Sequence, residues 1–256
     1  MGPGGPFRAL SLDLWFTALY YSPERDEQWK EDRARLLRYA LRVRDGKRLD
    51  LSAVEGAMEA VHARLRAQGR ESITFDPANL VPQYAEYLDA ELTVPLDEFA
   101  RDYSMVGLAE HPPIANPEAV SIVHALTERE IPVIAITNTA RRGSTWKEYL
   151  RGVVHLDFQH VIASCDSGVA KPNPAIFREA ARRLGLANNE ILHVGDRWEL
   201  DVEGALGAGF GAALYSGLWH RYPEGLYPTT EPNLTVQSSV PCLQSLEDLL
   251  KRDFRA

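Results

Sequence analysis

The sequence has 256 residues, of which 45% are hydrophobic and 25% are charged, a composition typical of a packed globular protein and not of a disordered chain or a fibre. Its 28 basic and 36 acidic residues give a net charge of −8, which disfavours nucleic acid and anionic membranes as partners. No apolar run approaches the roughly 20 residues of a membrane span and the start does not resemble a signal peptide, so we expect a cytoplasmic protein.

A short apolar run near the start of the chain predicts a first strand. Residues 9–12 read Ala-Leu-Ser-Leu, which is too short for a helix, and the run ends at a single acid, Asp13. Continuous apolar runs of this length are typical of strands that are buried on both faces. We therefore expect the first strand to carry Asp13 at its end.

From about residue 23 to residue 105 the sequence predicts helices and no strand. Apolar residues at helical spacing share one face of a first helix: Trp29, Leu36, Ala40 and Val43. The same spacing marks a second helix: Val54, Met58, Val61 and Leu65. Ser52 and Glu55 have the spacing of a capping box at the start of this second helix. Two shorter helices are expected over residues 81–88 and 96–105.

After a turn at residues 111–113, predicted strands and helices alternate. The expected strands are residues 132–137, 161–164, 191–194 and 212–215. The expected helices are residues 117–128, 143–150, 174–185 and 202–208, and Asn116 and Asn173, each followed by a proline, are the expected caps of the first and third of them. This alternation predicts an α/β fold with a doubly wound, Rossmann-like parallel sheet. We assign residues 1–17 and 112–256 to this core domain and residues 18–111 to an inserted α-helical domain.

Polar residues follow four of the predicted strands, at the edge where ligands bind in such sheets. They are Asp13 with Thr17, Thr137 with Asn138, Lys171, and Asp196 with Asp201. Taken singly, each has an ordinary structural explanation, such as a helix cap, a turn or a solvated lysine. Together they supply a carboxylate nucleophile, a hydroxyl and an amide for an anion, a cation, and further carboxylates for a metal.

In this order, the four groups resemble the motifs of the haloacid dehalogenase superfamily. These motifs are DxDxT, a Thr or Ser at a strand end, a Lys before a helix, and GDxxxxD. Here they correspond to residues 13–17 (Asp-Leu-Trp-Phe-Thr), 137–138 (Thr-Asn), 171–174 (Lys-Pro-Asn-Pro) and 195–201. The resemblance covers roughly residues 7–22 and 106–256. It implies that the helical insert is a cap domain between the first and second motifs.

The resemblance also implies roles for these residues. Asp13 would attack the substrate and form a covalent aspartyl intermediate. Thr137 would hold the transferring group, and Lys171 would pair with Asp13 and with the substrate's negative charge. Thr17 and Asn138 would contact the substrate. Mg²⁺ would be held by a set of oxygen ligands: Asp13, the backbone carbonyl of Trp15, Asp196, and Asp201 directly or through water.

One residue departs from the family pattern. Trp15 stands where the family's phosphatases have a second Asp, which protonates the leaving group and later activates water, and an indole does neither. Three interpretations stay open: a magnesium-dependent phosphatase of a small phosphorylated metabolite, with weak turnover; a metal-independent 2-haloacid dehalogenase; and a catalytically silent binding protein with the same fold. We favour the first because the fourth motif keeps both acids, which would carry uncompensated charge without a cation.

Several weaker features surround these motifs. Five arginines mark the first predicted helix and its end, and we interpret them as its solvated face rather than as a substrate-attracting patch: Arg33, Arg35, Arg38, Arg42 and Arg44. We interpret Arg141 and Arg142 as a surface pair at a helix start, with an anionic group of the substrate as the alternative contact. Trp219, His220 and Arg221 follow the last core strand and are candidates for the border of the site. We expect a small anionic substrate as the partner and allow for a homodimer.

Overall fold

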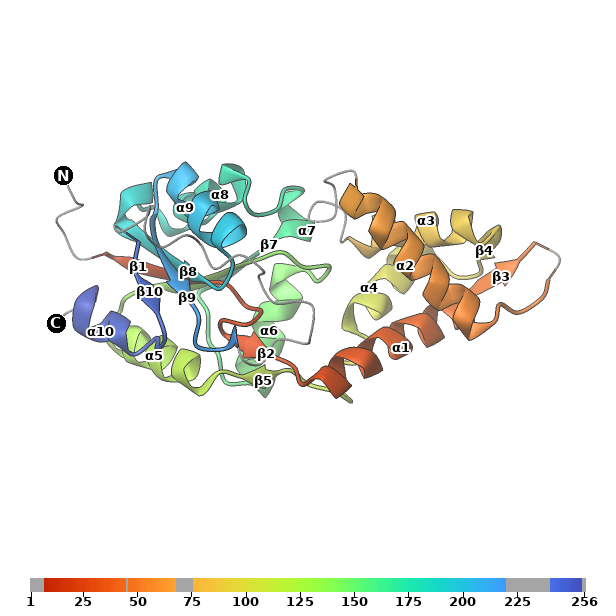
Figure 1. The fold of residues 1–256 in the computed structure, drawn as a ribbon, viewed down its shortest axis with the longest axis horizontal. Coiled ribbons are helices and arrows are strands. Elements are labelled where there is room, and N and C mark those ends of the chain that lie inside the picture. Colours follow the sequence, from red (N-terminus) through yellow and green to blue (C-terminus); the bar gives the residue numbers. More distant parts are fainter. Residues whose placement is uncertain (1–6, 45, 68–75, 220–239, 255–256) are drawn as a thin grey trace. The chain divides into compact units, whose positions relative to one another are not determined.

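The computed structural model describes residues 7–44, 46–67, 76–219 and 240–254 and divides into two compact units (Figure 1). The first, which we call the α/β unit, comprises residues 1–20, 114–137 and 142–256. The second, the helical unit, comprises residues 21–113 and 138–141. The sequence predicts divisions after residues 17 and 111 and does not assign the short segment 138–141 to the helical part. None of the helices in the described ranges is long and apolar enough to cross a membrane.

The α/β unit is built on a six-stranded parallel sheet. Its strands are β1 (Ala9–Leu12), β6 (Val133–Thr137), β7 (His160–Ala163), β8 (Ile191–Gly195), β9 (Gly211–Tyr215) and β10 (Cys242–Leu243). Their order across the sheet is β10-β9-β8-β1-β6-β7, with every neighbouring pair parallel. The predicted doubly wound α/β fold is therefore confirmed, and β10 is an additional edge strand that the sequence analysis did not predict.

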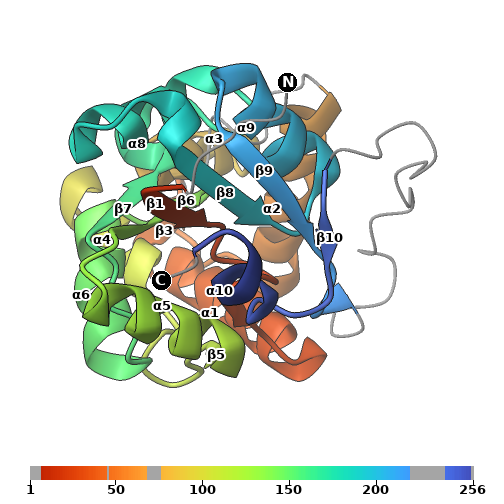
Figure 2. The same cartoon turned by 90° about the vertical axis from the view of Figure 1, so that its left-hand side faces the viewer.

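Helices cover both faces of this sheet. They are α5 (Pro117–Glu128), α6 (Gly143–Val153), α7 (Ser164–Ser167), α8 (Pro174–Leu184), α9 (Glu203–Ala208) and α10 (Asp248–Arg252). Figure 2 shows α8 and α9 on one face and α5 and α6 on the other. The side chains of Asn116 and Asn173 cap α5 and α8, and each is followed by a proline at the first helical position, as predicted. Gly185 and Gly209 end α8 and α9 with positive φ.

The central strands are completely buried because apolar side chains fill the space between sheet and helices. β1 and β6 have no exposed residue, and one core cluster joins the sheet to α8 and α9 through Ile134, Ile176, Phe177, Ala205 and Leu214. A two-stranded antiparallel ribbon, β2 (Leu19–Tyr20) with β5 (Ile114–Ala115), lies where the chain leaves and re-enters the α/β unit. This packing holds the carboxyl ends of β1, β6 and β8 in fixed register.

The helical unit contains α1 (Pro23–Ala40), α2 (Leu51–Ala67), α3 (Pro77–Tyr87) and α4 (Leu96–Met105), packed around a core of their own. It also contains β3 (Leu41–Val43) paired antiparallel with β4 (Ala90–Leu92), so the expectation of no strand was wrong. Val43 consequently lies in a strand and not on the face of the first helix. A three-residue strand is stabilised by its distant partner, here about fifty residues away, and leaves no local periodicity to read.

The predicted capping box in the second helix was also wrong. α2 begins at Leu51, and the amide of Val54 donates to the carbonyl of Asp50, so Ser52 lies inside the first turn. Of the five arginines interpreted as a solvated face, Arg35, Arg38 and Arg44 are exposed, as predicted, whereas Arg42, which lies in β3, is partly buried, and so is Arg33. Its guanidinium lies 5.1 Å from the ring centre of Trp29 and 5.7 Å from that of Tyr103. Arg33 thus packs its guanidinium against two aromatic rings of the helical unit rather than extending fully into solvent.

Candidate active site

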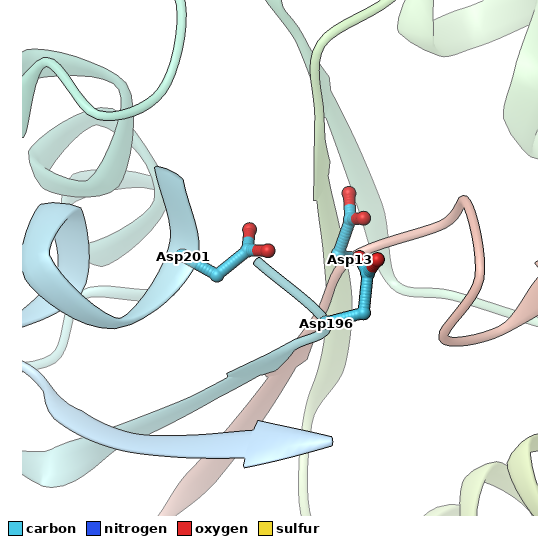
Figure 3. A group of neighbouring side chains, drawn as sticks. All are labelled: Asp13, Asp196 and Asp201. Carbon is cyan, nitrogen blue, oxygen red and sulfur yellow. The ribbon is translucent and has the colours of Figure 1, made fainter. Parts of the chain in front are cut away.

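Asp13 and Asp196 lie side by side because they follow neighbouring parallel strands. Asp13 comes directly after β1 and Asp196 directly after β8, and Leu12 pairs in register with Val194. The Asp13 amide donates to the Val194 carbonyl at 2.9 Å, which extends the ladder by one residue. Figure 3 shows the two carboxylates next to each other at this end of the sheet. The sequence prediction that strand ends would bring these acids together is confirmed by this geometry.

Asp201 reaches the same place from a short π-helix, η2 (Trp198–Val202). The Asp201 amide donates to the Arg197 carbonyl at 2.8 Å, and Asp201 Oδ2 accepts from the Arg197 amide at 3.0 Å. π-Helical turns are rare and are often found at functional sites. Gly195 makes the approach possible, since a Cβ at this position would lie 2.2 Å from Cγ of Asp201. The π-helix therefore places the Asp201 carboxylate next to Asp13, at the end of β1.

Three carboxylates lie close together, and one lysine pairs with two of them. One oxygen of each acid lies within 4.8 Å of the others, and all three side chains are buried. Lys171, which precedes α8 in the chain, donates to Asp13 Oδ1 at 2.7 Å and also to Asp201 Oδ1. Lys171 itself is only 2% exposed. The described cluster thus places three buried acids together, with Lys171 paired to two of them.

Burial and mutual repulsion change the acidity of these groups. Burial, followed by the charge of Asp201, raises the pKa of Asp13 to about 6 against the attraction of Lys171. Burial and the charges of Asp13 and Asp201 raise the pKa of Asp196 well above its ordinary value. For Asp201, burial is outweighed by Lys171 and His193, which lower its pKa. Asp201 and Lys171 therefore form the stable ion pair, whereas Asp13 and Asp196 carry unfavourable charge.

A buried histidine of β8 forms a hydrogen bond with the Asp201 carboxylate. His193 is fully buried, its Nε2 lies 3.2 Å from Asp201 Oδ1, and its Nδ1 lies 2.9 Å from Ser11 Oγ. Burial lowers the pKa of His193 and keeps the ring neutral. Because a carboxylate only accepts, Nε2 carries the proton and Ser11 donates to Nδ1. The sequence analysis missed both residues, since nothing local distinguishes a His or Ser inside an apolar strand.

Two predicted substrate-binding hydroxyls have no hydrogen-bond partner in the described structure. Thr137, at the end of β6, and Thr17, after β1, are fully buried, and neither Oγ1 makes a hydrogen bond. Buried hydroxyls normally find a partner, so both are available to a bound ligand. Asn138 follows Thr137 directly in the chain but belongs to the helical unit. Its role in substrate binding stays a prediction.

Trp15 lies in the tight loop between β1 and β2. Phe16 adopts a left-handed conformation (φ 55°), and the Ala18 amide donates back to Leu14 at 2.9 Å. The Trp15 ring packs edge-on against Trp146 of α6, with ring centres 5.6 Å apart and an interplanar angle of 71°. Trp15 is partly buried, and Trp146 is completely buried. The loop thus presents an aromatic ring two residues after Asp13.

The remaining candidates divide between core and surface. Arg142 is exposed, as expected, but Arg141 is only 2% exposed and stacks on Trp29 at 4.1 Å, so its assignment to a surface pair was wrong. The aromatic face and the aliphatic stem compensate for this burial. Trp219 Nε1 donates to the backbone carbonyl of Asp196 at 3.3 Å, which places it at the border of the site. His220 and Arg221 lie outside the described residues.

The cluster fits a divalent cation. Its three carboxylates and one ammonium leave a formal charge of −2 in a buried place, with His193 neutral. Asp196 Oδ2 is buried and makes no hydrogen bond in the described structure, as expected of an oxygen that coordinates a cation when one is bound. Carboxylate oxygens are the ligands that Mg²⁺ prefers. Both oxygens of Asp201 are already occupied, so Asp13 and Asp196 are the more direct ligands.

Comparison with protein families gives one match over most of the chain. A family model for haloacid dehalogenase-like hydrolases matches residues 16–209. This range begins just after Asp13 and includes Thr17, Thr137, Lys171, Asp196 and Asp201. It also spans the whole helical region.

Individual curated relatives and solved structures that resemble this chain are also hydrolases. A glyceraldehyde 3-phosphate phosphatase from Methanopyrus kandleri is 39% identical over 93 residues, which are 36% of this chain and 40% of the relative. The chain thus matches less than half the length of this curated relative. A phosphatase of the same superfamily from Thermococcus onnurineus has a TM-score of 0.61 at 18% identity, covering 95% of this chain and 96% of its own. A 2-haloacid dehalogenase from Pseudomonas syringae pv. Tomato also has a TM-score of 0.61, at 19% identity, with 95% and 96% coverage. At these identities the structures show the fold alone.

Proposed function

This chain belongs to the haloacid dehalogenase-like hydrolase family, and on that basis we propose that it is a magnesium-dependent phosphatase of a small phosphorylated metabolite. The reaction would pass through an aspartyl intermediate on Asp13. The curated relatives named as phosphatases support the general class of reaction. Metal dependence and mechanism are our inference from the site.

The observation that carries the proposal is the excess of negative charge around Asp13. One oxygen each of Asp13, Asp196 and Asp201 lies within 4.8 Å of the others, and Lys171 pairs with Asp13 and Asp201. Buried like charges at this distance repel strongly unless a cation separates them. A magnesium ion would balance the site, and when bound it would supply positive charge to the oxygens of a phosphoryl group.

Each protein group has a task in this mechanism. The carboxylate of Asp13 attacks phosphorus, and Lys171 holds it in place through the 2.7 Å hydrogen bond while adding positive charge beside the transferring group. The free hydroxyls of Thr17 and Thr137 donate to phosphoryl oxygens. Asp201 positions Lys171 and, with Asp196, forms the acidic side of the cation site. Water then hydrolyses the aspartyl phosphate and regenerates Asp13.

The alternatives account less well for the same residues. A dehalogenase that works without metal would give no role to Asp196, a buried acid whose charge is unfavourable in the absence of a cation. A silent binding protein would use the two unpartnered threonine hydroxyls but gives no task to Asp13 and its buried partner Lys171. Both remain as outcomes of the experiment below.

The direct test is hydrolysis of p-nitrophenyl phosphate with Mg²⁺ and with chelator, using wild type and Asp13→Asn. Asp157→Asn, a change at an exposed aspartate of the same unit, is the matched control. We expect magnesium-dependent release of nitrophenol by wild type and Asp157→Asn, and none above background by Asp13→Asn. In parallel, halide release from a 2-haloacid is measured in chelator.

Each result has a distinct meaning. Halide release without metal, with no phosphate release, would replace the proposal with the dehalogenase function. No turnover of either substrate by protein that unfolds cooperatively would leave the binding protein. Equal phosphate release with and without chelator would support the phosphatase function but contradict its dependence on magnesium.

A further inference from the structure

Among the described residues of the α/β unit, the ionisable side chains next to Asp13 are Lys171, His193, Asp196 and Asp201. Lys171 shares its ammonium between Asp13 and Asp201. His193 is fully buried, with its two ring nitrogens directed at Ser11 and Asp201. Asp201 accepts from Lys171 and from the Arg197 amide, and Asp196, whose Oδ2 makes no hydrogen bond in the described structure, is assigned to the cation by the proposed function. None of these ionisable groups is free to give a proton to a departing oxygen.

The loop after β1 does not supply the missing donor. Trp15 lies two residues after Asp13, and its indole ring packs on Trp146. The indole N–H of Trp15 has negligible acidity. Thr17 and Thr137 offer only hydroxyls, which hydrogen bond to a phosphoryl group but are too weakly acidic to protonate a leaving group at neutral pH. Under the proposed function, the described residues of the α/β unit would bind and attack a phosphoryl group without protonating its leaving group.

The basicity of the leaving group then decides which substrates react. An alkoxide is strongly basic and needs a proton as its bond to phosphorus breaks, and absence of that proton usually costs about 10²–10⁴ in rate. A carboxylate is a weak base, with an acid pKa near 4, and departs as a stable anion. The cost of lacking a general acid thus falls on alkyl phosphates and spares acyl phosphates.

We infer that this chain is selective for phosphoryl compounds that release a weakly basic anion, with acyl phosphates as the biological class. The inference rests on the proposed phosphatase function and adds the nature of the leaving group. It separates this chain from a phosphatase that acts on an ester of a primary alcohol, such as glyceraldehyde 3-phosphate.

The two steps balance without a general acid. In the first, an oxygen of Asp13 forms a bond to phosphorus, the bond from phosphorus to the acyl oxygen breaks, and the electron pair leaves on a carboxylate. In the second, water oxygen bonds to phosphorus, the bond to Asp13 breaks, and the water proton passes to the phosphate product or to solvent. The aspartyl intermediate is itself an acyl phosphate, so the second step also expels a weak base.

The test measures kcat/KM with Mg²⁺ for acetyl phosphate, a series of aryl phosphates of rising phenol pKa, and glyceraldehyde 3-phosphate. Asp13→Asn provides the background. We expect kcat/KM to fall steadily with leaving-group basicity, by about 10²–10⁴ from acetyl phosphate to the alkyl ester. A flat dependence would overturn the inference, because it would require a proton donor. Failure of every substrate, acetyl phosphate included, would instead reject the proposed phosphatase function.

A second comparison tests the position itself. Trp15→Asp introduces a carboxylic acid two residues after Asp13, and Trp15→Asn introduces a side chain of the same size that is not an acid. We expect Trp15→Asp to raise the rate with the alkyl ester relative to acetyl phosphate and so to flatten the dependence, whereas Trp15→Asn keeps it steep. Identical slopes for the two variants would count against a missing acid at this position. The wild-type series decides the matter even where a variant does not fold.

Discussion

The ammonium of Lys171 lies 2.7 Å from Oδ1 of Asp13, and the two residues are 158 positions apart in the chain. Lys171 also donates to Asp201, so one cation is shared between two buried carboxylates. Both contacts are buried, where charge interactions are much stronger than at the surface. This relationship makes Lys171 important for stability as well as for chemistry.

Replacing Lys171 with Met should therefore affect both properties. Removing one partner of a buried ion pair leaves uncompensated charge and typically costs about 3–5 kcal/mol, and phosphatase activity should fall to background. Lys147→Met is the matched control, because Lys147, in the same unit, donates to the backbone carbonyl of Gln159 and pairs with no carboxylate among the described residues. Urea unfolding in chelator measures the stability. A Lys171→Met protein as stable as Lys147→Met would show that the pair contributes little.

Asp196→Asn should stabilise the protein when metal is removed. Burial and the neighbouring carboxylates make the charge of Asp196 unfavourable, and an amide of the same shape removes it. We expect Tm in chelator to rise by about 2–4 °C, the shift that about 1 kcal/mol produces in a domain of 150–250 residues. Mg²⁺ should raise Tm of the wild type but not of the variant. A lower Tm for Asp196→Asn in chelator would contradict this account.

The pH dependence of stability should show the raised pKa of Asp13, about 6 in the folded protein. Between its ordinary value near 4 and about 6, folded Asp13 holds a proton that the unfolded chain has lost. This group's contribution to stability is therefore fully present below pH 4, decreases as pH rises to about 6, and is constant above. Urea unfolding of wild type and Asp13→Asn in chelator isolates the effect. A difference between the two proteins that does not vary with pH would exclude it.

Gly195→Ala should disturb the site without disturbing the fold. The new Cβ would lie 2.2–2.5 Å from atoms of the Asp201 side chain, which must move away from Lys171. Loss of such a supporting contact typically costs about 10–100-fold in metal affinity or activity. Gly207→Ala is the control, because its nearest neighbour is 3.8 Å away and an alanine in α9 stabilises a helix by up to about 1 kcal/mol. Kinetics with titrated Mg²⁺ would reveal the difference, and equal activity of the two variants would refute the contact's importance.

Local sequence pattern was enough to predict the α/β sheet, the helix caps at Asn116 and Asn173, and the meeting of Asp13 with Asp196. These features depend on local pattern together with one general rule, that parallel strands present their carboxyl ends at the same edge. The catalytic and metal-binding roles of the site residues remain predictions that the experiments above address.

Other features were decided only by tertiary structure, because they depend on register and packing between distant segments. Ser11 meets His193 only because β1 pairs with β8 in one particular register. β3 exists because β4 pairs with it, and Arg141 is buried because Trp29 covers its guanidinium. Local sequence records the preference of each segment, whereas partners far apart in the chain are set by the fold's total packing energy.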